Sequence, residues 1–254
     1  MAIRDRLGKL LIRGNGEGGV SSVAADTPAV SSPRHAAAAD APDVLALDPA
    51  ARVRTLGHRA FIGGQTPEMW FGIGRMQYHY LVSQGLRPHH VFLDVACGAL
   101  RLGQYLIPFL DEGNYQGIEG EAALIDEGLA EEVLYGLGQS KAPRFVCNYA
   151  FDVRGLKPFD YAIAQSLLTH LNAGDIAACF AGVAERAQAG SRFYVTWFEG
   201  DEADNPDGPS HAQMNWYYPF ARLAELAAES GWRLERIGDW GHPRGQMMAL
   251  ARRT

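Results

Sequence analysis

Two acidic residues stand near the ends of apolar segments that are spaced like neighbouring strands of one sheet. Asp94 lies in the segment VFLDV, just before a small-residue turn that contains Ala96, Cys97 and Gly98. Glu119 ends the segment YQGIE. Small residues let a ligand lie against backbone amides, and a carboxylate at the second position accepts hydrogen bonds from both hydroxyls of a ribose. The spacing therefore favours a nucleoside-type ligand.

Two nucleoside cofactors compete for such a turn. A dinucleotide needs glycines in the order G-x-G-x-x-G, so that its pyrophosphate can approach a helix N-terminus. Gly98 and Gly103 are present here, but Leu100 stands between them. S-adenosylmethionine has no pyrophosphate, and the turn favours it over NAD. An NAD-dependent oxidoreductase remains the alternative enzyme.

An alternation of apolar strands and amphipathic helices, which begins at Val91, must hold this turn in place. We expect strands over 91–95, 115–119, 144–148, 159–166, 191–198, 232–240 and 246–253. We expect helices over 100–110, 121–137, 173–189 and 219–230. This alternation predicts an α/β fold, a doubly wound, mostly parallel seven-stranded sheet of Rossmann-like type. The short connection from Gly241 to Gly245 predicts an antiparallel C-terminal hairpin at the sheet edge.

The first 51 residues differ in composition from the rest. Residues 1–13 place apolar side chains at helical spacing between basic ones, which predicts a short basic helix. This helix could contact an anionic membrane surface weakly, or simply dock on the protein. Residues 14–51 are mostly small or polar, so we expect a disordered linker. One cofactor-binding domain is expected over 52–254, with a helical cap at 66–86.

Composition and charge argue against several classes of function. The formal net charge is −6, so no excess of Lys and Arg is available for a nucleic-acid backbone, and we expect no nucleic-acid partner. No apolar run approaches the ~20 residues of a transmembrane helix, and the N-terminus lacks the apolar stretch of a secretory signal. The three cysteines lack metal-ligand spacing, which favours reduced thiols in the cytoplasm.

Three segments, in this order, resemble the class I S-adenosylmethionine-dependent methyltransferases: LDVACGALRLGQYLIPFL, YQGIEGEAALIDEGLAEE and FDYAIAQSLLTHL. The similarity runs from about Thr66 to the C-terminus, and the closing IGDWGHPRGQMM also looks like bacterial small-molecule and saccharide methyltransferases of this class. The resemblance implies S-adenosylmethionine as cofactor and methyl transfer as activity. The family often has glycine where this chain has Ala96 and Leu100, and an acidic residue near Asn148. These departures motivate a second alternative, a regulatory protein that binds the cofactor without catalysis.

The resemblance also implies roles for residues at the strand ends. Asp94 and the backbone of 96–98 would face the methionine moiety, while Glu119 would hold the ribose. Asn148 or Tyr149 would lie near the adenine. The residues after the fourth strand would border the methionine and the methyl group. The full set of expected cofactor-binding residues is Asp94, Ala96, Cys97, Gly98, Glu119, Gly120, Asn148, Tyr149, Gln165 and Ser166.

Methyl transfer to a hydroxyl requires an aligned nucleophile and a base that removes its proton. Histidine is the natural base near neutral pH. His170 is the first candidate because it follows the strand that ends beside the methyl group, although it could instead cap the helix at 173. His242 and Glu199 are further candidates, and Glu199 could also be an exposed loop carboxylate.

The acceptor is expected to be a small molecule or saccharide with a hydroxyl group. No Asn-Pro-Pro-Tyr-type sequence follows the fourth strand, which argues against exocyclic amines of nucleic-acid bases. Acidic residues at 201–204 could hold Mg²⁺, but such loops are usually solvated and we expect no metal. Arg244 could orient an anionic acceptor or pair with Asp239. Six aromatic residues could lie on the acceptor side or belong to ordinary core and hairpin packing; they are Trp197, Phe198, Trp216, Tyr217, Tyr218 and Trp240.

Overall fold

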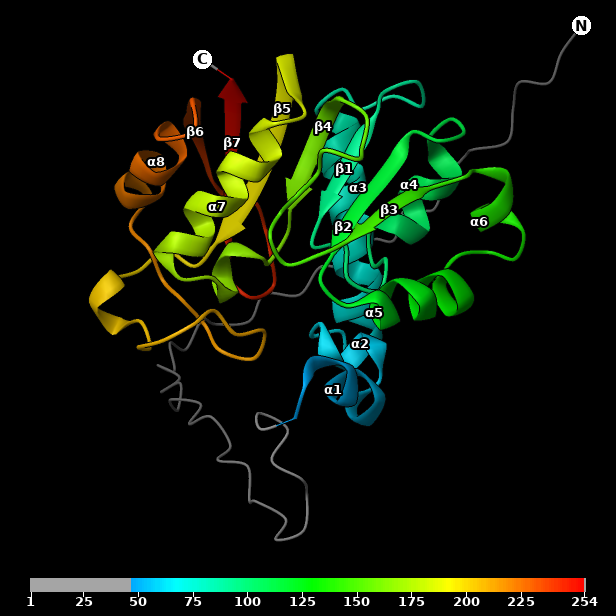
Figure 1. The fold of residues 1–254 in the computed structure, drawn as a ribbon, viewed down its shortest axis with the longest axis horizontal. Coiled ribbons are helices and arrows are strands. Elements are labelled where there is room, and N and C mark those ends of the chain that lie inside the picture. Colours follow the sequence, from blue (N-terminus) through cyan, green and yellow to red (C-terminus); the bar gives the residue numbers. More distant parts are fainter. Residues whose placement is uncertain (1–46, 254) are drawn as a thin grey trace, which may run out of the picture. The chain divides into compact units, whose positions relative to one another are not determined.

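The computed structural model describes residues 47–253, which contain a seven-stranded sheet in the order β3-β2-β1-β4-β5-β7-β6. The strands are β1 (Phe92–Val95), β2 (Tyr115–Glu119), β3 (Arg144–Cys147), β4 (Phe159–Ala164), β5 (Ala187–Trp197), β6 (Trp232–Asp239) and β7 (Met247–Arg253). The first five strands are parallel, and β7 is antiparallel to both β5 and β6. The predicted doubly wound sheet with its C-terminal hairpin is confirmed (Figure 1).

Helices cover both faces of this sheet. The α-helices are α1 (Pro49–Leu56), α2 (His58–Phe61), α3 (Ile73–Ser83), α4 (Gly103–Phe109), α5 (Ala122–Glu127), α6 (Leu137–Ser140), α7 (Ala173–Ala184) and α8 (Phe220–Ala228). Helices α7 and α8 pack on one face, and α3, α4 and α5 pack on the other. In Figure 1, α7 accordingly lies in front of the sheet and α3 behind it. No helix among residues 47–253 is long and apolar enough to cross a membrane.

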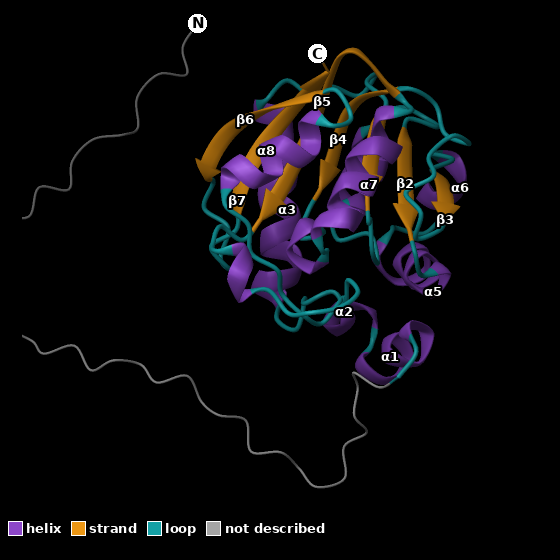
Figure 2. Cartoon of the chain, turned by 60° about the vertical axis from the view of Figure 1, so that its left-hand side comes forward, coloured by secondary structure: helices purple, strands orange, loops and turns teal. Residues whose placement is uncertain are grey.

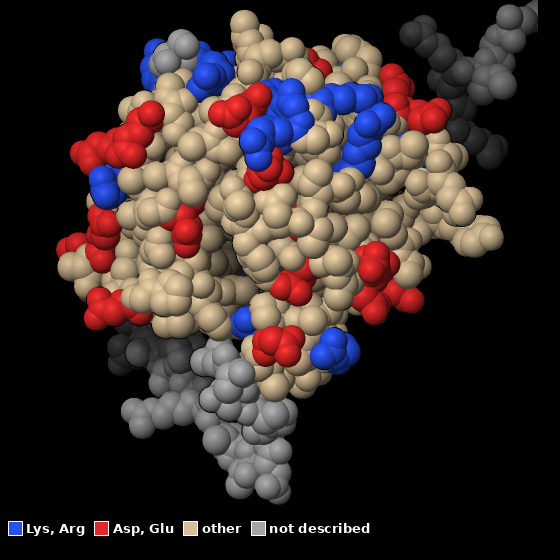
Figure 3. All heavy atoms as spheres, viewed as in Figure 1, with Lys and Arg blue, Asp and Glu red and all other residues tan. Residues whose placement is uncertain are grey.

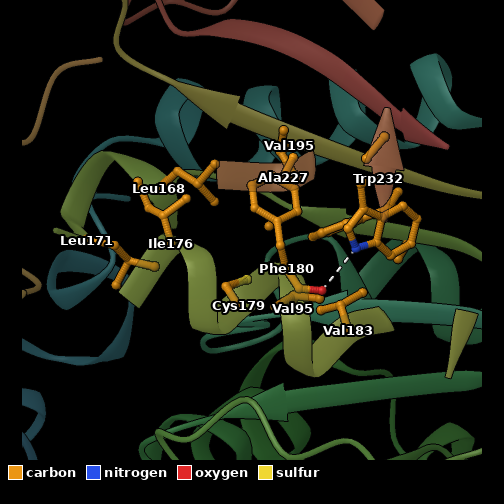
Figure 4. Close-up of a cluster of buried hydrophobic side chains, with 14 of the residues drawn as sticks. Val95, Leu168, Leu171, Ile176, Cys179, Phe180, Val183, Val195, Ala227 and Trp232 are labelled. Carbon is orange, nitrogen blue, oxygen red and sulfur yellow. Dashed lines mark hydrogen bonds between the residues drawn. The ribbon is translucent and has the colours of Figure 1, made fainter. Parts of the chain in front are cut away.

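The period-2 geometry of the strands divides their side chains between the two layers. In β1, Leu93 and Val95 join the core under α7 and α8, whereas Phe92 joins the core under α3 and α4. Figure 4 shows the first of these cores, where the indole nitrogen of Trp232 donates to the backbone oxygen of Phe180 at 2.9 Å. Both faces of the sheet are therefore covered by packed side chains. A ligand site has to lie at the ends of the strands.

Several element boundaries differ from the sequence-based expectation. The expected helix over 121–137 ends earlier: α5 passes into a π-helical turn at Gly128–Glu132, and the chain is extended at Val133. A Cβ at Gly128 would lie 2.8 Å from the carbonyl carbon of Ala99, so this helix approaches the first turn very closely. Helix α1 begins at Pro49, before the expected domain start at 52, because Asp48 caps it. The predicted basic helix, and the predicted linker up to residue 46, lie outside the described residues.

Residues 49–72, here called the cap segment, lie beyond the carboxyl ends of the parallel strands (Figure 2). Glu132, on the π-helical turn after α5, anchors this segment. Its side chain is 2% exposed and accepts hydrogen bonds from His58 Nε2 (2.7 Å), Arg59 Nε (2.6 Å) and Trp70 Nε1 (3.0 Å). Burial alone would raise the pKa of Glu132, but these three donors hold it below its usual value. One carboxylate thus fixes the cap segment to the sheet domain.

Charges on the face drawn in Figure 3 are unevenly distributed. Most Lys and Arg side chains gather near the top of this view, whereas Asp and Glu are spread over the rest, including the end where the parallel strands point. A phosphate backbone would find no broad basic surface at that end of this face.

Candidate active site

A cavity of about 550 Å³ opens where the carboxyl ends of β1, β2 and β4 meet. All ten residues expected to bind the cofactor line this cavity, and so does His170. Ligands of open α/β sheets bind at this edge, where the strand order reverses. The strand order here reverses between β1 and β4, so the cavity lies at the switch point.

The turn after β1 adopts left-handed backbone conformations at residues that are not glycine. The φ angles are 58° at Ala96 and 62° at Leu100, and Gly98 has a φ of 55°. Each of these two left-handed non-glycine conformations costs about 1 kcal/mol. Backbone hydrogen bonds hold the turn, from Cys97 N to Ile118 O and from Leu100 N to Cys97 O, each at 3.1 Å. The turn therefore keeps its shape without glycine at these positions.

Glu119 ties the end of β2 to this turn. Its carboxylate accepts hydrogen bonds from the backbone N–H groups of Gly98 (2.8 Å), Gly120 (2.8 Å) and Glu121 (3.2 Å). Burial raises the pKa of Glu119 above its usual value, although these donors act in the opposite direction. Because Oε2 accepts only one of the three hydrogen bonds, it can still accept another from a ligand hydroxyl.

Asp94 is a buried carboxyl group at the end of β1. The hydroxyl of Tyr115 donates to its Oδ2 at 2.8 Å. Burial raises the pKa of Asp94 to about 7, while this hydrogen bond and the nearby Arg101 lower it. A cation placed beside Asp94 would favour the ionised form of the carboxyl.

A buried polar network positions the end of β4. Ser166, whose φ is 57°, donates its backbone N–H to Thr196 Oγ1 at 2.8 Å. The amide oxygen of Gln246, a residue that is 1% exposed, accepts from Gln165 Nε2 (2.9 Å), Ser166 Oγ (3.0 Å) and Thr196 Oγ1 (2.9 Å). Gln246 was not among the expected site residues, yet it holds Gln165 and Ser166 at the cavity wall.

His170 is the one predicted base that lines the cavity. Its Nδ1 lies 2.6 Å from the backbone oxygen of Met214. Because a carbonyl oxygen only accepts, Nδ1 carries the proton and Nε2 presents a free lone pair. Burial lowers the pKa of His170, so the ring stays neutral. Asn172, not His170, caps α7, accepting the N–H of Asp175 at 2.9 Å.

The other two predicted bases do not line the cavity. Glu199 forms an ion pair with Arg236 on β6. His242 is buried behind the wall, where its ring stacks on Trp240 and its Nε2 lies 3.3 Å from Gln165 Nε2. Burial, together with nearby arginines, lowers the pKa of His242 to about 4. Neither residue is retained as a catalytic candidate.

The residues after β3 shape one end of the cavity. The side chain of Asn148 is engaged in its own turn, because its Oδ1 accepts the N–H groups of Ala150 (3.1 Å) and Asp152 (3.0 Å). The hydroxyl of Tyr149 donates to the carboxylate of Glu121. A Cβ at Gly120 would lie 2.3 Å from the Tyr149 ring, so only glycine permits this packing. Tyr149 therefore offers its ring face as a wall, while Asn148 shapes the backbone.

Of the two roles that the sequence left open for the aromatic residues around β5, the structure supports core packing and not an aromatic acceptor side. None of the six aromatic residues lines the cavity. Three of them are at most 2% exposed and belong to the core with α7 and α8; these are Trp197, Trp216 and Tyr218. Polar residues of the loop 209–215 take their place at the wall.

The loop 209–215 and the cap segment close the cavity together. Gln213 Nε2 donates to Phe61 O at 3.1 Å, and Arg52 Nη1 donates to His211 Nε2 at 2.9 Å. Ile62 lies directly on the first turn, since a Cβ at Gly98 would be 3.0 Å from its Cδ1. No local pattern in the sequence signals these contacts, because each joins segments far apart in the chain.

Two buried amide oxygens at the cavity have no hydrogen-bond partner among the described residues. They are Oε1 of Gln77, on α3, and Oε1 of Gln165. Arg101 is 8% exposed, donates to Met69 O at 3.2 Å and forms no ion pair within residues 47–253. Burial lowers the pKa of Arg101 to about 10. Together with Asp94, these groups offer acceptors that suit an ammonium group and a donor that suits a carboxylate.

The described residues contain no cluster of side chains suited to a metal ion. Within residues 47–253, no group of three or more His, Cys, Asp or Glu side chains could hold a metal ion. Cys97, Cys147 and Cys179 form no disulfide.

Comparisons with known proteins bear on the fold. No protein-family model and no curated protein sequence matches the chain. Magnesium protoporphyrin IX methyltransferase from Synechocystis PCC 6803, solved with bound S-adenosylmethionine, is 18% identical and has a TM-score of 0.57, over 82% of this chain and 99% of that one. An S-adenosylmethionine-dependent methyltransferase from Clostridium acetobutylicum ATCC 824 is 11% identical, with a TM-score of 0.55 over 80% and 98% of the two chains. Human N-acetylserotonin methyltransferase, in complex with S-adenosylmethionine, is 15% identical, with a TM-score of 0.58 over 80% and 58%.

These similarities confirm, at the level of the fold, the resemblance that three sequence segments indicated. The described chain has the Rossmann-like fold of the S-adenosylmethionine-dependent methyltransferases.

Proposed function

We propose that this chain is a methyltransferase that binds S-adenosylmethionine and methylates a hydroxyl group of a small molecule or saccharide. The observation that carries the proposal is the polar pattern of one cavity. It combines a carboxylate suited to a ribose with unpartnered acceptors and a buried arginine suited to an amino-acid moiety. Solved neighbours of the same fold that contain S-adenosylmethionine support this cofactor.

Each part of the cofactor has a matching group in the cavity. Glu119 would accept a ribose hydroxyl through Oε2 of its carboxylate. Asp94 and the unpartnered amide oxygens of Gln77 and Gln165 would accept from the ammonium group. Arg101 would bind the carboxylate, which would give its buried charge a partner. An α-amino acid has an ammonium group for these three acceptors and a carboxylate for this one donor.

When bound, the cofactor supplies an electrophilic methyl group on a sulfonium, whose carbon–sulfur bond breaks with its electron pair on sulfur as the acceptor oxygen takes the methyl. The base in this chain is His170. Its Nε2 lone pair takes the hydroxyl proton, and the hydrogen bond from Nδ1 to Met214 O keeps the ring in the required tautomer. The cap segment covers the cavity and limits the water around the reacting groups.

A small acceptor fits the size of the site. The volume of about 550 Å³ lies within the usual ~300–1,000 Å³ of ligand cavities and must also hold the cofactor. The solved neighbours act on different acceptors, to judge from their names, which include magnesium protoporphyrin IX, N-acetylserotonin and a glycopeptide. The hydroxyl acceptor therefore follows from His170 and not from those proteins. We also propose a cytoplasmic enzyme, because all three cysteines are unpaired.

The first test is calorimetric titration of the purified protein with S-adenosylhomocysteine, with NADH as the parallel ligand. We expect micromolar binding of S-adenosylhomocysteine alone. Glu119→Ala should weaken it about 10- to 100-fold, since a hydrogen bond from a ligand hydroxyl to a charged group is lost. The exposed Glu229→Ala is the matched control and should bind normally. Absence of binding to the unmodified protein would refute the proposal.

The second test addresses His170. His170→Ala should lower methyl transfer by about 10² to 10⁴ while affinity for S-adenosylhomocysteine stays within about twofold. Because burial lowers the pKa of His170, the neutral base persists to more acidic pH than an ordinary histidine would allow, and the rate should fall only there. Unchanged transfer in the variant would remove His170 from the mechanism.

A further inference from the structure

Besides Arg101, a second arginine lines the cavity that also contains His170. Arg244, in the loop between β6 and β7, donates to the backbone oxygen of Gly63 in the cap segment. The sequence left open a pair with Asp239, but Asp239 instead accepts the backbone N–H of Gly241 at 2.9 Å. Arg244 forms no ion pair with any carboxylate among residues 47–253.

The carboxylates that line the cavity are already engaged elsewhere. Glu119 binds three backbone N–H groups, Asp94 binds the Tyr115 hydroxyl, and Asp175 accepts the hydroxyl of Ser210. Within residues 47–253, Arg244 therefore has no carboxylate as an ion-pair partner. The proposed cofactor brings a single carboxylate, which Arg101 suits better because it is buried beside Asp94. One arginine of the cavity is left for the acceptor.

The surroundings of His170 are positively charged as well. The charge of Arg244 disfavours protonation of His170. His211 accepts a hydrogen bond from Arg52, and burial together with Arg52 lowers the pKa of His211, so its ring is neutral. Arg52 is 6% exposed, has a buried Nε without a partner and forms no ion pair among the described residues. An anionic group brought near this wall would gain from the charges of Arg244 and Arg52.

We propose that the acceptor carries a carboxylate in addition to the hydroxyl that is methylated, and that Arg244 binds this carboxylate. This inference rests on the proposed function of the cavity. The guanidinium group is planar and binds carboxylates through two parallel N–H groups, and only one of its nitrogens donates to Gly63. Arg244 is thus a specificity-determining residue, which fixes the acceptor with its hydroxyl toward His170.

The test uses the full chain with S-adenosylmethionine whose methyl group carries a heavy isotope, incubated with a small-molecule extract of the source cells. Labelled products are separated on an anion exchanger at pH 7 and identified by mass spectrometry. We expect a labelled product that is retained and contains a carboxylate. A neutral or cationic product, or one whose only anion is a phosphate, would overturn the inference and leave methyl transfer standing. Absence of any labelled product, with S-adenosylhomocysteine bound, would overturn the proposed function and this inference with it.

A variant then separates acceptor binding from closure of the cap segment. Arg244→Gln should raise the KM for the isolated acceptor at least tenfold, with kcat and affinity for S-adenosylhomocysteine within about threefold. The carboxamide of the same acceptor should be equally poor for both proteins. Arg233→Gln, an exposed change on β6, is the matched control. Equal loss of turnover for the acceptor and its carboxamide would show that Arg244 only holds Gly63, and the inference would fall.

Discussion

The two walls of the cavity are built in different ways. The sheet wall comes from the ends of β1, β2 and β4 and is held by backbone and buried hydrogen bonds, of which Glu119 alone accepts three. The cap wall comes from the cap segment and the loop 209–215, and single side-chain hydrogen bonds such as that from Gln213 to Phe61 hold it closed. The sheet wall suits an invariant ligand, whereas the cap wall depends on Glu132 and on these few side-chain hydrogen bonds for its attachment to the sheet domain.

This contrast also separates the proposed roles. The groups suited to the cofactor, with Glu119 and Asp94 as examples, belong mostly to the sheet wall. The groups suited to the acceptor, Arg244 and His211 among them, lie on loops that meet the cap segment. A fold that serves many acceptors gains from this division, because loops can vary while the strand ends stay fixed.

The largest effect should come from Asp94 in the sheet wall. Asp94→Asn should weaken binding of S-adenosylmethionine at least about 100-fold, because a carboxylate facing an ammonium group is lost. The same change should stabilise the ligand-free protein. Since folding raises the pKa of Asp94 from 3.8 to about 7, the wild type loses stability as pH rises from about 4 to about 7, and the variant does not.

Thermal unfolding followed from pH 4 to pH 9 measures this difference. The gain in Tm of Asp94→Asn should grow up to about pH 7 and then stay constant. Asp111→Asn, an exposed change, is the matched control. A variant that is less stable than the wild type at pH 8 would contradict the raised pKa.

A substitution of Gln246 tests whether the hydrogen bonds of the sheet wall contribute to the stability of the whole domain. Gln246→Leu should destabilise the protein by about 3 kcal/mol, because it leaves buried donors of Ser166, Thr196 and Gln165 without their acceptor. Denaturant unfolding should show one cooperative transition at lower denaturant concentration. A loss confined to cofactor binding, with stability unchanged, would mean that the network serves only the ligand.

Glu132 tests the opposite expectation for the cap wall. Glu132→Gln weakens the pairing with Arg59 and His58 and should cost about 2 kcal/mol, felt mainly in residues 49–72. Hydrogen exchange should accelerate in that segment and stay slow in β1 and β4, while affinity for S-adenosylhomocysteine drops about tenfold. Glu131→Gln, next to it and exposed, is the control. Equal acceleration throughout the sheet would refute the idea of a separately held cap.

The smallest effect is expected at Ala96. Ala96→Gly relieves a left-handed conformation but adds freedom to the unfolded chain, so stability should change by less than about 1 kcal/mol. Affinity for S-adenosylhomocysteine should stay within about threefold. A gain of tenfold or more would show that the alanine side chain obstructs the site, in favour of the regulatory alternative.

The sheet wall could be predicted from the sequence because its signals are local. Asp94, the turn after it and Glu119 follow from strand spacing, whereas the role of the end of β4 was implied by the resemblance to the methyltransferases. The cap wall could not be predicted in this way. Its contacts join residues such as Arg52 and His211, which lie far apart in the chain and whose types also suit an exposed surface.

Errors in the site prediction share a physical cause. His242 sits in a Gly-Pro-containing loop that reads as exposed, yet stacking on Trp240 and contact with Gln165 place it inside the protein. From the sequence, the aromatic residues around β5 could either contact a ligand or pack in the core. In the structure the buried ones pack in the core. Burial depends on contacts with distant parts of the chain. The local sequence of such segments therefore does not indicate whether their side chains are buried.

The anchoring of the cap segment by Glu132 limits how this domain can be recombined. A chimera that received the cap of another protein would keep a buried carboxylate with no donors, unless the incoming segment supplied an equivalent of His58, Arg59 and Trp70. The cap segment and the turn after α5 therefore form one structural unit, although more than fifty residues separate them in the chain. A change of acceptor specificity in this chain by exchange of the cap has to move both pieces together.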